Sequence, residues 1–138
     1  MRNARLALTL LLATGALVGA SPVAAHGSCS GTAAITTVGV APSGLVSGTG
    51  SINCTATHDR YTMELTFQYR TTPGAGGWTT IFPTFFRTWE NSNSTSVSWT
   101  RSVSCLPGVR EWRVLNHWTA GDVHSGSVTP AGVVVVCL

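Results

Sequence analysis

The residues best suited to chemistry lie at or near segments that the sequence predicts to be loops. They comprise all four histidines and two of the five acidic residues: His26, His58, Asp59, His117, Asp122 and His124. Imidazole and carboxylate groups together act as metal ligands or as general acid–base pairs. We therefore expect a site where these loops meet. Histidine is also common in loops that hold no site, and that alternative stays open.

The chain begins with the features of a secretory signal. Arg2 and Arg5 form a positive start, residues 6–18 are largely apolar, and Val23-Ala24-Ala25 offers small residues for cleavage. The apolar run is shorter than the ~20 residues that a membrane span needs. We expect cleavage after Ala25, which leaves residues 26–138 as a secreted, extracellular protein with no membrane span. An uncleaved anchor is the alternative.

Cleavage at this point would make His26 the first residue of the mature chain. Its free amine and its imidazole could then chelate one ion, and nitrogen-rich tetragonal sites favour Cu(II). Asp122 and His124 are two positions apart, which places both on one side of an extended chain. These three residues are the predicted copper ligands. The alternative is that His26 starts an unstructured tail.

Composition limits the remaining function classes. Residues 26–138 contain six arginines, no lysine and five acidic residues, so the net charge is close to neutral. This argues against capture of nucleic acid or of an anionic membrane, both of which require a basic patch. The chain has no G-x-S-x-G motif and no pair of acids in a glycosidase-like pattern. We expect an extracellular partner or a glycan, with no identity assigned.

Four cysteines lie in the exported part of the chain, at positions 29, 54, 105 and 137. An even number of cysteines in a small exported domain predicts two disulfides, for which three pairings exist. No two of the cysteines have C-x-x-C spacing, which argues against a zinc site.

Residues 61–70 show the clearest secondary-structure pattern. Apolar side chains occupy the odd positions and polar ones the even positions, as in a half-buried β-strand. Similar patterns predict strands within residues 29–40, 51–57, 78–82, 97–105, 109–118 and 124–138, and Arg101 interrupts the apolar face of one of them. The run at 133–136 is continuously apolar, which predicts a strand buried on both faces. We expect no helix after the signal.

The five tryptophans could include a surface on which sugar rings stack. More often such residues are core or half-buried strand positions. We expect Trp99 and Trp112 to lie inside and Trp78, Trp89 and Trp118 to be exposed. Together with His58, Asp59 and His117, Trp118 completes the set of candidate ligand-binding residues.

The strand pattern resembles the fibronectin type III and immunoglobulin-like families. Residues 65–70, the glycine-rich loop and residues 78–81 resemble the third and fourth strands of that fold, and residues 112–116 resemble its sixth. The resemblance implies an all-β, immunoglobulin-like antiparallel β-sandwich of about seven strands with two disulfides. In that strand order Cys29 pairs with Cys54, Cys105 pairs with Cys137, and the histidine-bearing loops share one end. A fold of this kind implies no function.

Two further resemblances concern the first mature residue. His26, Asp122 and His124 resemble the ligands of CopC-type periplasmic copper carriers, although Gly-Asp-Val-His departs from that family's Asp-Gly-His and the four cysteines are foreign to it. A leading His-Gly is similar to the start of lytic polysaccharide monooxygenases, which are longer. The leading hypothesis is a secreted, non-catalytic binding module. The alternatives are an extracellular copper(II)-binding protein and a small carbohydrate-active or sugar-binding domain.

Overall fold

The strand β4 (Tyr61–Arg70), whose alternation the sequence predicts, lies inside the larger sheet with strands paired on both of its sides. In the computed structural model, which describes residues 27–138, the side chains of Tyr61, Met63, Leu65 and Phe67 are buried. The even-numbered side chains of the strand are only partly covered. The prediction that this strand has one apolar face is therefore confirmed.

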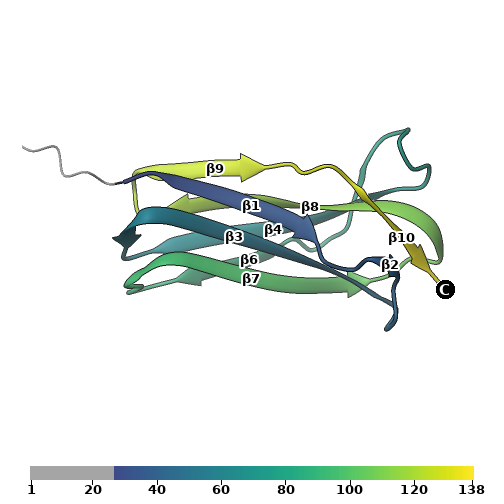
Figure 1. Cartoon of the computed structure of the whole chain (residues 1–138), viewed down its shortest axis with the longest axis horizontal. Coiled ribbons are helices and arrows are strands. Elements are labelled where there is room, and N and C mark those ends of the chain that lie inside the picture. The colour runs from purple at the N-terminus through teal and green to yellow at the C-terminus, as the bar shows by residue number, and fades with distance from the viewer. Residues whose placement is uncertain (1–26) are drawn as a thin grey trace, which may run out of the picture.

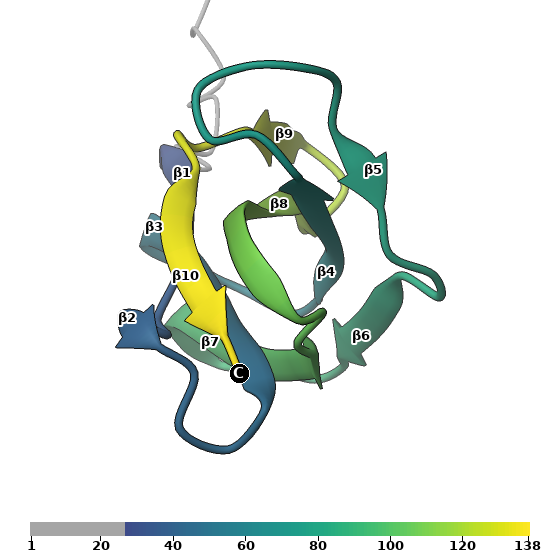
Figure 2. The ribbon, with the colours of Figure 1, turned by 90° about the vertical axis from the view of Figure 1, so that its right-hand side faces the viewer.

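Two sheets face each other, and the described residues contain no helix (Figures 1 and 2). The smaller sheet has the order β1-β3-β7, from β1 (Cys29–Ile35), β3 (Leu45–His58) and β7 (Ser94–Ser104). The larger sheet has the order β2-β10-β8-β4-β5, in which β6 also pairs with β4 and β9 with β8. Its other strands are β2 (Gly39–Val40), β5 (Thr79–Thr80), β6 (Phe85–Trp89), β8 (Gly108–Ala120), β9 (His124–Val128) and β10 (Val133–Cys137). All pairs are antiparallel except β2 with β10.

Small residues in β3 allow the two sheets to approach closely. A methyl group built on Gly50 would lie 2.6 Å from Leu65 Cδ2, and one built on Gly48 would lie 2.9 Å from Val114 Cγ1. Asn116, in β8, crosses the same interface and is 1% exposed. Its Nδ2 donates hydrogen bonds to backbone carbonyls of β1 and β3. The sandwich is thus held by apolar packing together with a buried polar link from Asn116.

An ion pair anchors the loop after β4 to β8. Arg70 Nε donates to Glu111 Oε2 at 2.6 Å, and the backbone nitrogen of Gly74 donates to the same oxygen at 2.7 Å. Glu111 is a buried residue. The hydrogen bond from Arg70, followed by that from Gly74, holds the pKa of the Glu111 carboxyl below its ordinary value.

The disulfides join Cys29 to Cys54 and Cys105 to Cys137, as predicted. The first links two residues that are direct partners in the β1–β3 ladder. The second links the end of β7 to the last residue of β10, at the opposite end of the sandwich. Two such bridges are consistent with an oxidising, extracellular environment.

The structure corrects several sequence-based expectations. Ten strands are described rather than about seven, because residues 29–40 and residues 124–138 each form two strands and β6 lies in a segment for which no strand was predicted. The interpretation of residues 133–136 as buried on both faces is wrong: Val134 is 46% exposed and Val135 is buried, since only one face of β10 packs on the core. Among residues 27–138, no helix is long and apolar enough to cross a membrane. The expected signal, residues 1–25, and His26 lie outside the described residues.

Candidate functional site

Two turns meet at the end of the sandwich that lies on the left in Figure 1. One joins β3 to β4 and begins at His58, and the other joins β8 to β9 and ends at His124. The backbone nitrogen of Gly121 donates to the carbonyl of Arg60 at 2.8 Å, which ties the turns together. Gly121 has a φ of 59°, and a methyl group there would lie 3.0 Å from His58 Nδ1. Glycine is therefore the residue that suits this contact.

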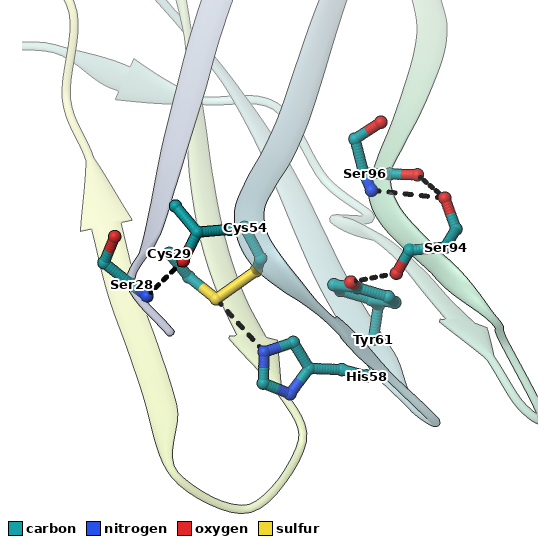
Figure 3. Close-up of a disulfide and its surroundings, with 8 residues drawn as sticks. Ser28, Cys29, Cys54, His58, Tyr61, Ser94 and Ser96 are labelled. Carbon is teal, nitrogen blue, oxygen red and sulfur yellow. Dashed lines mark hydrogen bonds between the residues drawn. A yellow bond between two sulfur atoms is a disulfide. The ribbon is translucent and has the colours of Figure 1, made fainter. Parts of the chain in front are cut away.

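We call the set His58, Asp59, Asp122 and His124 the histidine pole. His58 is 8% exposed, and its Nε2 lies 3.5 Å from Cys29 Sγ (Figure 3). Its ring is 5.3 Å from the His124 ring, centroid to centroid, at an interplanar angle of 84°. Disulfide, backbone and neighbouring ring thus hold the His58 imidazole in one orientation.

The buried side chain of Tyr61 contacts His58 from the core of the sandwich. Its ring lies 5.9 Å from that of His58, and its hydroxyl donates to the carbonyl of Ser94 at 2.6 Å (Figure 3). Burial raises the pKa of the Tyr61 hydroxyl, so the group stays neutral and acts as a donor near neutral pH. This hydrogen bond connects Tyr61, which packs against the histidine pole, to β7.

Two adjoining hollows open at the pole. One, of about 380 Å³, is lined by residues that include Asp122 and His124, and the other, of about 460 Å³, by residues that include His58, Asp59 and Asp122. Asp122 lines both hollows, so its carboxylate borders the space next to each histidine. Imidazole and carboxylate groups of this kind can contribute ligands to a metal ion or exchange protons with a ligand.

The metal-ligating atoms of the pole do not by themselves complete a site. Within residues 27–138, the one group of three ligand atoms within 4.8 Å of each other consists of Cys29, Cys54 and His58. The two sulfurs are bonded to each other, so they are not thiolate ligands. Among the described residues, His124 and Asp122 belong to no group of three such closely spaced ligand atoms, so a metal ion at the pole would need a further ligand.

Two of the candidate ligand-binding residues lie elsewhere. His117 lines neither hollow; it is exposed, and its Nδ1 lies 2.7 Å from Ser127 Oγ, across the pair β8–β9. The expected exposure of Trp118 is wrong, since it is 5% exposed. Methyl groups built on Gly31 and Gly126 would lie 2.1 Å and 2.7 Å from its indole. The two glycines leave room for Trp118 between β1 and β9.

The sequence analysis missed a second polar cluster, which lies where the edge strands β6 and β7 meet. It consists of Phe85, Arg87 and Trp89 from β6 and of Trp99 and Arg101 from β7, and we call it the arginine–aromatic seam. Trp112 is buried as expected, whereas Trp99 is only partly buried because it belongs to this seam. The alternation at 85, 87 and 89 and at 99 and 101 was the available signal. It did not show that the two segments meet.

Comparisons with known proteins give little further information. No family model matches the chain, and no curated protein matches it. Among solved structures, the chain is similar to a crystal structure of a Bordetella pertussis protein described as ApaA. The sequence identity is 13%, the TM-score is 0.43, and the match covers 80% of this chain and 92% of that one. This similarity carries no argument about function and leaves the immunoglobulin-like family a prediction.

Proposed function

We propose that the protein is an exported binding module of immunoglobulin-like fold, without catalytic activity, that binds its ligand at the histidine pole. The observation that carries the proposal is the meeting of the His58 and His124 rings, 5.3 Å apart, from two separate turns. Asp122 borders the hollows beside both histidines. The two disulfides support export because such bonds persist in oxidising compartments.

A transition-metal ion, Cu(II) in particular, is the ligand that this chemistry favours. His58 and His124 offer imidazole nitrogens, and Asp122 offers a carboxylate oxygen, a ligand set that suits tetragonal copper. Cleavage after Ala25 would add the amine and imidazole of His26. Packing against Gly121 and the disulfide holds His58 before any ion binds, which lowers the cost of ordering it.

Titration of Cu(II) into residues 26–138, followed by calorimetry and electron paramagnetic resonance, tests the proposal. Mass spectrometry first confirms that His26 is the first residue. We expect one ion per chain, nitrogen hyperfine structure, and weaker binding as the pH falls and the imidazoles are protonated. His124→Ala should weaken binding by about tenfold or more.

Two control proteins distinguish copper binding at the histidine pole from binding by other nitrogen groups of the chain. His117→Ala removes an exposed histidine from the outer face of β8 and should leave binding unchanged. A chain with one extra residue before His26 lacks the free histidine amine and should bind more weakly. Equal affinity of the wild type and His124→Ala would contradict a site at the pole, and equal affinity of the extended chain would remove His26 from it.

A further inference from the structure

The arginine–aromatic seam lies on the open side of the sandwich, between edge strands of different sheets (Figure 2). The ladder pairs Arg87 with the buried Met63, so Arg87 belongs to the inward-facing row of β6. In the same way Arg101 pairs with Gly48, on the inward-facing side of β3. Both arginines therefore emerge from between the two sheets rather than from an outer face.

Aromatic rings hold both guanidinium groups in place. The Arg87 Cζ lies 4.7 Å from the Trp89 ring centroid and 5.9 Å from that of Trp99. The Arg101 Cζ lies 4.5 Å from the Phe85 centroid and 5.6 Å from that of Trp99. The two cations thus share one indole. Stacking on rings limits the freedom of each side chain, so less entropy is lost when a ligand binds.

In the part of the chain that the structure describes, neither arginine of the seam has an acidic partner. Within residues 27–138, the ion pairs formed by arginines are Arg60–Glu90 and Arg70–Glu111, and no carboxylate lies within 4.0 Å of Arg87 or Arg101. The sequence has no acidic residue between Glu64 and Glu90, nor between Glu90 and Glu111. Two neighbouring positive charges without a counter-charge favour an anionic ligand.

The surroundings of the seam suit a sugar chain. A hollow of about 340 Å³ is lined in part by Phe85, the residue whose ring Arg101 stacks on. Phe82, Ser102 and Ser104 also line this hollow. Such a surface offers apolar contact to the C–H face of a sugar ring.

We propose that the arginine–aromatic seam binds a carboxylate-bearing polysaccharide of the uronic-acid class. Arg87 and Arg101 each donate paired N–H groups to a sugar carboxylate, which is the geometry in which guanidinium is strongest. The sugar ring next to Arg101 rests on the hollow at Phe85. The site is distinct from the histidine pole, and its test requires no metal.

Inward-pointing charges on edge strands also prevent sheets from pairing between molecules. That role requires only a charge, whereas saccharide binding requires the planar guanidinium. Arg101→Lys separates the two, because lysine keeps the charge but lacks the fork of donors.

Calorimetric titration of residues 26–138 with oligogalacturonate tests the proposal, with maltooligosaccharide of equal length as the neutral probe and oligo-aspartate as the acidic peptide. We expect binding of oligogalacturonate alone, weakened by salt. Arg87→Gln, Arg101→Gln and Arg101→Lys should each lower the affinity about tenfold or more. Arg110→Gln is the matched control, because Arg110 also stacks on an aromatic ring, 5.1 Å from the Tyr69 centroid, outside the seam.

Each other outcome overturns the proposal. No binding of oligogalacturonate leaves the arginines as protection of the sheet edges. Equal binding of the neutral oligosaccharide removes the carboxylate from recognition. Equal, arginine-dependent binding of oligo-aspartate makes the seam a site for acidic peptides, and an equal loss in Arg110→Gln shows a response to net charge alone.

Discussion

The substitution Asn116→Asp tests how the two sheets are joined. Asn116 is 1% exposed, and its Nδ2 donates to the carbonyl oxygens of Thr32 at 2.9 Å and Ser51 at 3.1 Å. Aspartate has nearly the same size and shape but replaces this donor with an oxygen. Once the carboxyl is ionised, the two carbonyls face an acceptor instead of a donor, while the apolar packing around the side chain is unchanged.

Two terms set the expected loss of stability. At low pH the protonated carboxyl donates one hydrogen bond where the amide donated two, which gives a loss of about 1 kcal/mol. Burial also raises the pKa of the introduced carboxyl in the folded protein, so the native state binds its proton more tightly than the unfolded state does. The free energy of unfolding should therefore fall further as the pH rises above about 4, by up to about 1.4 kcal/mol per pH unit. The fall ends where the pH exceeds the native-state pKa.

Urea denaturation with intact disulfides, followed by tryptophan fluorescence between pH 4 and 8, measures both terms. Asn53→Asp is the matched control, since Asn53 lies exposed on the outer face of β3 and donates only to Ser51 Oγ at 3.2 Å. It should change stability by less than about 0.5 kcal/mol. If Asn116→Asp costs no more than this control, or if its cost does not grow with pH, the buried link between the sheets does not contribute as described.

Three further predictions concern packing and charge. Gly31→Ala places a methyl group 2.1 Å from the Trp118 indole, and thermal unfolding should show a loss of about 1–3 kcal/mol; an unchanged midpoint would refute the close contact. Leu65→Ala should cost about 2–5 kcal/mol in urea denaturation and Thr66→Ala under about 1, whereas equal costs would contradict a strand with one buried face. Because the pKa of Glu111 is lowered, its stabilising effect is complete above the ordinary carboxyl pKa and is lost as the pH falls through the lowered value. Glu111→Gln should therefore lower stability at pH 7 and make the acid limb of the stability profile shallower, and an unchanged acid limb would argue against the ion pair.

The candidate site was predictable in part. The strand order inferred from the family resemblance placed the turns of His58 and His124 at one end, and the structure brings both rings together there. It did not predict that His58 rests on the Cys29–Cys54 bridge, because that contact depends on how far β3 extends beyond the disulfide. His117 was assigned to the same end, but it lies inside β8, since that strand continues to Ala120.

The sequence alone determined the all-β class, the buried face of β4 and the number of disulfides. The first two follow from the period-two alternation within single strands, and the number of disulfides follows from the cysteine count. Neither kind of information depends on how the strands pack against each other. The burial of Trp118 and the arginine–aromatic seam were decided only by the tertiary structure. Alternation within a strand specifies its two faces, but it does not specify which strand of the opposite sheet lies across the open edge. Arg87 and Arg101 come to share the Trp99 ring only because the sandwich sets the edges of β6 and β7 against each other.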